Sequence, residues 1–127
     1  MALPVAVLAG AVVAAAVVHL RSPAEEGNYP TCPFLMLTGW YCPGCGSMRA
    51  VHALTYLDVE TALARNPLAT VALVGVVIGY VQWAVRRWTG RPRTRMAPAW
   101  VLHALVVLIV VYGVARNLPG MEILSPA

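Results

Sequence analysis

The sequence predicts an all-α polytopic membrane protein with three transmembrane helices and two short interfacial helices in a cysteine-bearing outer loop. Of its 127 residues, 60% are hydrophobic and 11% charged, whereas soluble domains are about 45–50% apolar and about 25% charged. The apolar residues are gathered into three runs without acidic or basic side chains other than histidine, and all three cysteines lie between the first two runs. These features exclude an ordinary soluble globule and a disordered chain.

The three apolar runs predict transmembrane helices at about residues 3–20, 68–85 and 97–115. A helix of eighteen residues extends about 27 Å, close to the roughly 30 Å thickness of the hydrocarbon core. The first run lacks a basic segment before it and a small-residue cleavage site after it, so we expect an uncleaved anchor rather than a signal peptide. Residues 1–127 are expected to form a single membrane domain.

The distribution of arginine predicts how the chain is oriented. The loop at 86–96 is dense in arginine, whereas the outer loop, residues 21–66, holds only three arginines over a much longer stretch. Because basic loops stay in the cytoplasm, we expect the N-terminus and the loop at 86–96 to be cytoplasmic. The outer loop and the C-terminus are then extracytoplasmic. The arginine cluster is assigned to topology and to contact with anionic lipids, and no nucleic-acid partner is expected.

The outer loop is expected to contain two short helices, at about 48–57 and 59–65. Ser47 and Asp58 are residue types that favour the N-cap position of a helix. Pro67 suits the first turn of the second transmembrane span, because proline there sacrifices no helical hydrogen bond. We expect both short helices to lie at the outer membrane interface.

A cluster of cysteines is the strongest chemical signal in the chain, and a structural metal site is the first of three hypotheses for it. Cys32, Cys42 and Cys45 fall within fourteen residues, and a Cys-Pro-x-Cys-Gly turn resembles the knuckle of zinc ribbons. His52 is the favoured fourth ligand, because it lies seven residues beyond Cys45 and shares its helical face. His19, at the outer end of the first span, is a second candidate. This hypothesis predicts zinc as the cofactor.

Two hypotheses without a metal compete with it. A disulfide from Cys32 to either Cys42 or Cys45 would close the loop, require no cofactor and leave one thiol unpaired. Alternatively, Cys42 and Cys45 form a redox-active pair, with Arg49 helping to lower the pKa of the first thiol. The chain lacks the βαβ pattern of thioredoxin-like oxidoreductases. We therefore favour the metal site or the disulfide over redox catalysis, and expect no catalytic residue.

A series of short motifs occurs in a fixed order in and after the outer loop. They are Cys32-Pro33, Thr38-Gly39, Cys42-Pro43-Gly44-Cys45-Gly46, Arg49-Ala50, Asp58, Ala62 and Asn66-Pro67. This order resembles the small bacterial membrane proteins of the domain-of-unknown-function 2752 family. Two positions depart from the family pattern: Met48 stands where threonine is usual, and Leu57 stands where glycine commonly precedes the aspartate. The resemblance implies a helical membrane protein but no reaction.

A non-enzymatic role as a scaffold or accessory subunit of a larger membrane assembly is the expected function, with a membrane thiol–disulfide oxidoreductase as the alternative. The chain is too small to enclose a transport path and lacks paired intramembrane acids. Gly75 and Gly79 form a Gly-x-x-x-Gly pair that permits close helix approach, within the chain or to a partner. Expected partners are the lipid bilayer and other membrane proteins or a second copy. His103 is given no role.

The expected location is the bacterial inner membrane. The chain contains no lysine and is rich in alanine, valine and arginine, a composition typical of a bacterial gene of high GC content. The orientation derived from the arginine distribution places the cysteines on the extracytoplasmic side, in an oxidising compartment.

Overall fold

The computed structural model describes residues 2–25, 27, 29–30, 32–92, 97–121 and 124. Within these residues the secondary structure is entirely helical, which confirms the all-α part of the prediction. The helices are α1 (Ala2–Leu20), α2 (Pro33–Thr38), α3 (Ser47–Thr55), α4 (Val59–Arg65), α5 (Pro67–Thr89) and α6 (Ala99–Ala115).

Two of the described helices, not three, are long and apolar enough to cross a membrane. Helix α1 has 19 residues and α5 has 23. The prediction of a third full-length span at 97–115 is corrected, because α6 has 17 residues. It begins only after Pro98, whose ψ of 153° is extended and not helical. Helix α5 is longer than predicted because it continues to Thr89 and ends at Gly90, which has a left-handed φ of 66°.

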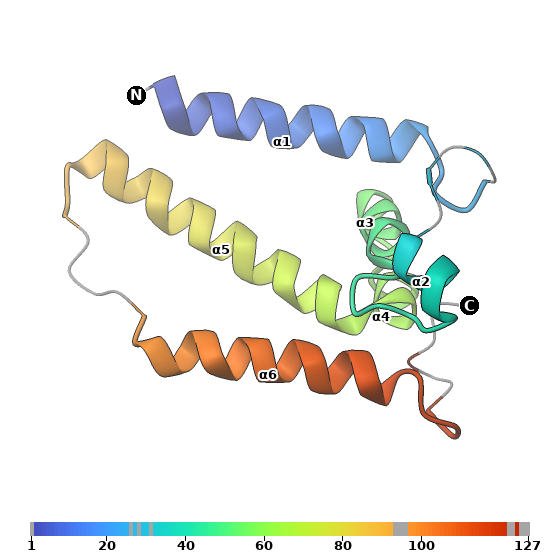
Figure 1. Ribbon diagram of the computed structural model, residues 1–127. Coiled ribbons are helices and arrows are strands. Elements are labelled where there is room, and N and C mark those ends of the chain that lie inside the picture. Colours follow the sequence, from blue (N-terminus) through green and yellow to red (C-terminus); the bar gives the residue numbers. More distant parts are fainter. Residues whose placement is uncertain are drawn as a thin grey trace.

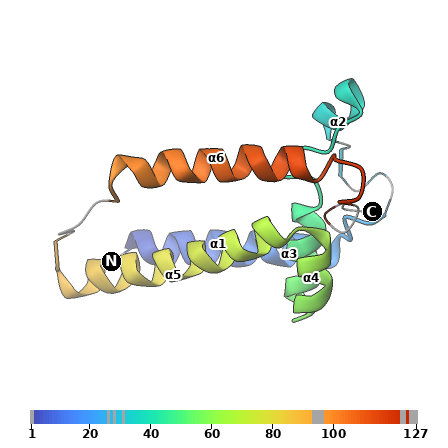
Figure 2. The same cartoon turned by 90° about the horizontal axis from the view of Figure 1, so that it is seen from below.

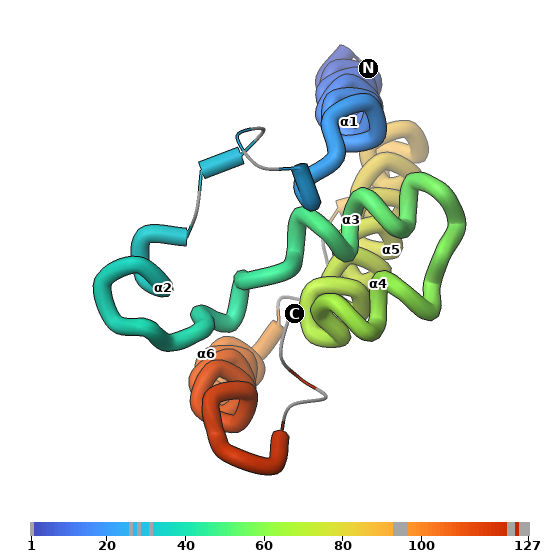
Figure 3. The backbone as a smooth tube through the Cα atoms, turned by 90° about the vertical axis from the view of Figure 1, so that its right-hand side faces the viewer, coloured from blue at the N-terminus to red at the C-terminus, as the bar shows by residue number. Residues whose placement is uncertain are grey.

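The three long helices extend in the same general direction, and the short helices gather at one end of the molecule (Figure 1). The N-terminus lies at the opposite end, near the end of α5 and the start of α6 (Figures 1 and 2). Seen along the helices, α1, α5 and α6 are spread apart, and α3 lies between α1 and α4 (Figure 3). The outer loop and the C-terminal end of α6 therefore lie at the same end.

The packed core lies among the short helices. Helix α3 contacts α1, α4 and α5, and α4 also contacts α5. Alanine side chains fill the centre, because Ala50, Ala53 and Ala62 are buried and Leu54 packs against them. Small side chains allow the helix backbones to approach closely. The long helices are mostly exposed: α6 contains no buried residue, so the short-helix end holds the described fold together.

The two short helices predicted in the outer loop are confirmed as α3 and α4. Asp58 caps α4 as expected, because its carboxylate accepts a hydrogen bond from the backbone N–H of Thr61 at 2.9 Å. The predicted cap of α3 is wrong by one residue. Gly46 is the N-cap, with a left-handed φ of 82°, and Ser47 is the first helical residue. The Ser47 hydroxyl instead accepts a hydrogen bond from Asn66.

The turn between α3 and α4 contains an unfavourable backbone conformation at Leu57. Its φ of 61° is the positive value of a left-handed residue, and no other non-glycine residue in the described chain has one. Its side chain is 87% exposed and gains little from packing. Glycine adopts such a positive φ without the steric cost of a Cβ atom.

We expect Leu57→Gly to stabilise the protein by about 0.5–1 kcal/mol. The left-handed conformation costs a non-glycine residue about 1–2 kcal/mol, and the greater freedom of glycine in the unfolded chain offsets part of that gain. Thermal unfolding of the detergent-solubilised protein, followed by circular dichroism, measures the change. Leu57→Ala is the control, because it shortens the side chain but keeps the Cβ atom. An equal rise for both variants would contradict the backbone explanation.

Candidate metal centre

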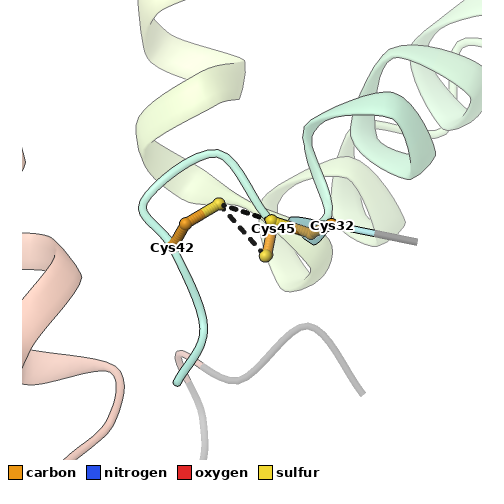
Figure 4. Close-up of side chains that lie close together, drawn as sticks. All are labelled: Cys32, Cys42 and Cys45. Atoms are coloured by element: carbon orange, nitrogen blue, oxygen red, sulfur yellow. Dashed lines mark hydrogen bonds between the residues drawn. The ribbon is translucent and has the colours of Figure 1, made fainter. Parts of the chain in front are cut away.

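The three cysteines converge, as the sequence predicted. Their sulfur atoms all lie within 4.8 Å of one another. The Cys42 Sγ is central, at 3.5 Å from Cys32 Sγ and 3.1 Å from Cys45 Sγ (Figure 4). All three are free thiols. Among the described residues, no histidine, aspartate or glutamate joins this group of potential metal ligands.

Local backbone geometry brings the sulfur atoms together. Cys32 is the N-cap of α2, a helix that the sequence analysis did not predict, and Gly39 ends that helix with a left-handed φ of 72°. The chain then returns to a tight turn in which the Cys45 N–H donates to the Cys42 carbonyl at 3.0 Å. Gly46 leaves this turn with a positive φ, whereas Gly44 does not have one. Gly39 and Gly46 therefore take a positive φ in this loop, and Gly44 does not.

The protein environment affects the acidity of two of the thiols in opposite directions. The pKa of Cys32 is lowered, chiefly because the backbone N–H of Leu35 donates a hydrogen bond to its sulfur and also because of its contact with Cys42. The pKa of Cys45 is raised to about 12, first by burial and then by hydrogen bonding to Cys42 and Cys32. A bound cation would favour the deprotonated form of both, because metal-coordinating thiols lose their protons.

Asn66, at the junction of α4 and α5, holds the cysteine turn in place through side-chain hydrogen bonds. Its side chain is completely buried, with 0% exposure. The Oδ1 atom accepts hydrogen bonds from the Ala69 N–H at 2.9 Å and the Tyr112 hydroxyl at 3.1 Å. The Nδ2 atom donates to three oxygens of the turn, the backbone carbonyls of Pro43 and Cys45 and the hydroxyl of Ser47, at 3.0–3.1 Å. One side chain therefore joins the turn, α5 and α6.

Arg116, directly after α6, fixes the same turn from another side. It is buried, with 3% exposure. Its Nη1 donates to the carbonyls of Cys42 at 2.9 Å and Cys45 at 3.0 Å, and more weakly to that of Pro43 at 3.4 Å. The guanidinium carbon lies 5.2 Å from the centre of the Tyr112 ring, a cation–π distance.

The end of α6 makes two further contacts with this loop. Asn117 pairs with the backbone of Tyr41: its Oδ1 accepts from the Tyr41 N–H at 2.8 Å, and its Nδ2 donates to the Tyr41 carbonyl at 2.9 Å. Gly113 lies against Pro43, because a Cβ atom at Gly113 would be 3.3 Å from the proline Cδ. Helix α6 is thus attached to the described chain through the cysteine loop.

The histidines that the sequence put forward as metal ligands lie away from the sulfur atoms. His52 Nδ1 donates to the Val18 carbonyl at 2.7 Å. His19 Nδ1 is hydrogen-bonded to the Thr55 hydroxyl at 3.0 Å, and its ring stacks on Tyr56 with centroids 4.3 Å apart. Both side chains tie α1 to α3, so the structure gives them a packing role at this interface.

His103 hydrogen-bonds within its own helix, to the Ala99 carbonyl at 2.8 Å. Of the basic loop, Arg93 and Arg95 lie outside the described residues.

An open groove gives access to the cysteines. It has a volume of about 710 Å³, and Cys32 and Cys45 form part of its wall together with Tyr41, Met48 and Arg49. Arg49, which the redox hypothesis placed beside the thiols, is an exposed residue of α3 on this groove. The groove therefore runs beside two of the three cysteines.

Sequence reasoning missed the two side chains that hold the turn. Asn66 appears in the sequence analysis only as part of the Asn66-Pro67 pair, and Arg116 has no role there. The available signal for Arg116 was a single arginine directly after an uncharged run, at the end of the chain where arginine is sparse.

Comparison with known proteins agrees with the resemblance drawn from the sequence. The model of a family described as "Protein of unknown function (DUF2752)" matches residues 32–80, a range that contains all three cysteines, α3, α4 and more than half of α5. No curated protein and no solved structure shows significant similarity to the chain. The comparisons therefore contribute a family but no activity.

Proposed function

We propose that this chain is a small bacterial membrane protein that binds one zinc ion through Cys32, Cys42 and Cys45 and serves as a scaffold or accessory subunit of a larger membrane assembly. The observation that carries the metal proposal is the convergence of three sulfur atoms within 4.8 Å. Thiolates are soft ligands that suit zinc. Asn66 and Arg116 hold the turn that presents two of them.

The spacing of the sulfur atoms fits a metal ion. Zinc–sulfur bonds of about 2.3 Å in tetrahedral geometry place sulfur atoms roughly 3.8 Å apart. Cys42 Sγ lies 3.5 Å from Cys32 Sγ and 3.1 Å from Cys45 Sγ, so small rotations of the side chains are sufficient. Three protein ligands leave a fourth position for water or for a donor from a partner. The groove beside Cys32 and Cys45 offers the route to that position.

The exposed surface supports a membrane location. The chain exposes 9413 Å², whereas a compact soluble protein of its 13.6 kDa exposes roughly 6,600 Å². The apolar windows of α1 and α5 are each only 11% buried, unlike the core helix of a soluble protein. Helix α6, with 17 residues, is shorter than either of these two candidate spans.

We propose that the cysteine loop is extracytoplasmic and the arginine-rich end cytoplasmic. Single cysteines introduced at Ala24 and Thr89, on a background without the native cysteines, test this orientation. Both positions are exposed; Ala24 follows α1 and Thr89 ends α5, and these two helices end at opposite ends of the molecule (Figure 1). In intact cells, an impermeant maleimide is expected to label Ala24→Cys but not Thr89→Cys. The reverse pattern would place the native cysteines in a reducing compartment.

An unused helix face supports association with another membrane protein or a second copy. Among the described residues, a Cβ atom at Gly75 or Gly79 would meet nothing within 4 Å outside its own helix, so the described helices do not pack closely against this pair. Small residues four apart allow another transmembrane helix to approach closely. Close helix contact at this face is the basis of the proposed scaffold role.

Thiol–disulfide exchange is a second candidate function, supported by the 3.1 Å separation of Cys42 Sγ and Cys45 Sγ and by the groove beside Cys45. In such a reaction the two thiols lose two electrons and two protons and form a disulfide. A substrate disulfide gains them and becomes two thiols.

Metal analysis and a free-thiol count on one preparation distinguish these functions. We expect about one zinc per chain and three thiols that react only after chelation, because bound thiolates are protected from alkylation. Metal-free protein with one free thiol would indicate a fixed disulfide. Metal-free protein whose Cys42 and Cys45 cycle between thiol and disulfide forms, with turnover of a disulfide substrate, would support the oxidoreductase instead.

A further inference from the structure

Within the described part of the chain, no acidic side chain is paired with the buried charge of Arg116. Its Nε and Nη2 atoms are buried and have no hydrogen-bond partner. Its Nη1 atom donates only to backbone carbonyls, those of Cys42, Pro43 and Cys45. Carbonyl dipoles offset part of the cost of burying a cation, but a buried ion is ordinarily paired with an opposite charge.

The thiols of the turn to which Arg116 is hydrogen-bonded can supply this negative charge. Two of the three carbonyls bonded to Arg116 belong to Cys42 and Cys45 themselves. Three thiolates around a divalent cation have a net charge of −1, and the guanidinium makes the assembly neutral. Three thiolates around a monovalent cation have a net charge of −2, which one arginine leaves uncompensated.

We propose that Arg116 is the built-in counter-charge of the three-cysteine centre, and that the centre therefore takes a divalent cation as a tris-thiolate complex. The inference rests on the proposed metal-binding function and adds the residue that balances the charge of the complex. Arg116 is a positioning residue: it contacts the backbone of two ligands, and its charge favours the anionic complex. Low polarity around buried groups strengthens such an interaction.

Titration with Co²⁺ tests this role in the full-length, reduced protein in detergent. Cobalt is a divalent probe whose sulfur-to-metal charge-transfer absorption reports how many thiolates are bound. Arg116→Gln removes the charge but keeps a hydrogen-bond donor for the turn, and Arg116→Lys keeps the charge. Arg21→Gln is the matched control, because it removes an exposed positive charge at the end of the molecule that holds the cysteines.

We expect Arg116→Gln to weaken Co²⁺ binding by about tenfold or more, with an unchanged charge-transfer spectrum at saturation. Arg116→Lys is expected to restore most of the affinity, and Arg21→Gln to bind like the wild type. Wild-type affinity in Arg116→Gln, equal losses in the Gln and Lys variants, or a weaker saturated spectrum would each overturn the counter-charge. Failure of the wild type itself to bind Co²⁺ would overturn the metal centre, a result distinguishable from the others.

Discussion

Replacing Asn66 with alanine is expected to destabilise the protein by about 3–5 kcal/mol and to disrupt the cysteine centre. The substitution removes the donor for Pro43, Cys45 and Ser47 and the acceptor for two further groups. Buried polar groups that lose their partners cost about 1–3 kcal/mol each, although such costs are not additive. Circular dichroism melting in detergent measures stability, and Co²⁺ titration measures the centre.

Asn66→Ser separates the two functions of this side chain. Serine is a good N-cap and can still accept a hydrogen bond from the Ala69 N–H, but it lacks the amide that reaches the cysteine turn. We expect serine to recover only about 1 kcal/mol relative to alanine, the usual value of a helix cap. Full recovery of stability and Co²⁺ binding in Asn66→Ser would mean that Asn66 acts as a cap of α5 alone.

Cys42→Ser is expected to weaken metal binding by at least a hundredfold, the largest effect of any single substitution on the centre. Its sulfur is central, at 3.5 Å from that of Cys32 and 3.1 Å from that of Cys45. Two thiolates alone form an incomplete zinc site, because structural sites use four ligands and open sites use three. Competition with a chromophoric zinc chelator measures the affinity of the purified protein.

His52→Gln is the informative companion variant, because the sequence predicted His52 as a ligand and the structure hydrogen-bonds it to the Val18 carbonyl. We expect its zinc affinity to stay within about threefold of the wild type, the size of a small indirect effect of under 1 kcal/mol. A loss as large as that of Cys42→Ser would show that His52 turns toward the sulfur atoms when the ion binds, and would restore the ligand set derived from spacing.

Features encoded in a few neighbouring residues were predictable from the sequence. Local residue preferences determine the Asp58 cap and the start of α5 at Pro67. The apolar character of α1 and α5 is likewise a property of consecutive residues. The convergence of the cysteines was also predictable, because they lie close together in the chain with turn-forming glycines among them.

Features set by contacts between distant segments were not predictable. The seven-residue spacing of His52 from Cys45 suggested a common face, but α3 begins only at Ser47 and presents His52 to α1. The link between Arg116 and the carbonyl of Cys42 spans 74 residues. Neither periodicity nor spacing contains information about such a contact.

The attachment of α6 to the cysteine loop has a consequence for the order in which the protein matures. Residues are synthesised from the N-terminus, so the turn at Cys42 and Cys45 leaves the ribosome long before Arg116. The carbonyls of this turn gain their arginine partner only when the last helix has been made. Contacts so distant in sequence form late in folding. The cysteine centre is therefore completed later than the turn itself is made, and a chain truncated before Arg116 would leave the site unfinished.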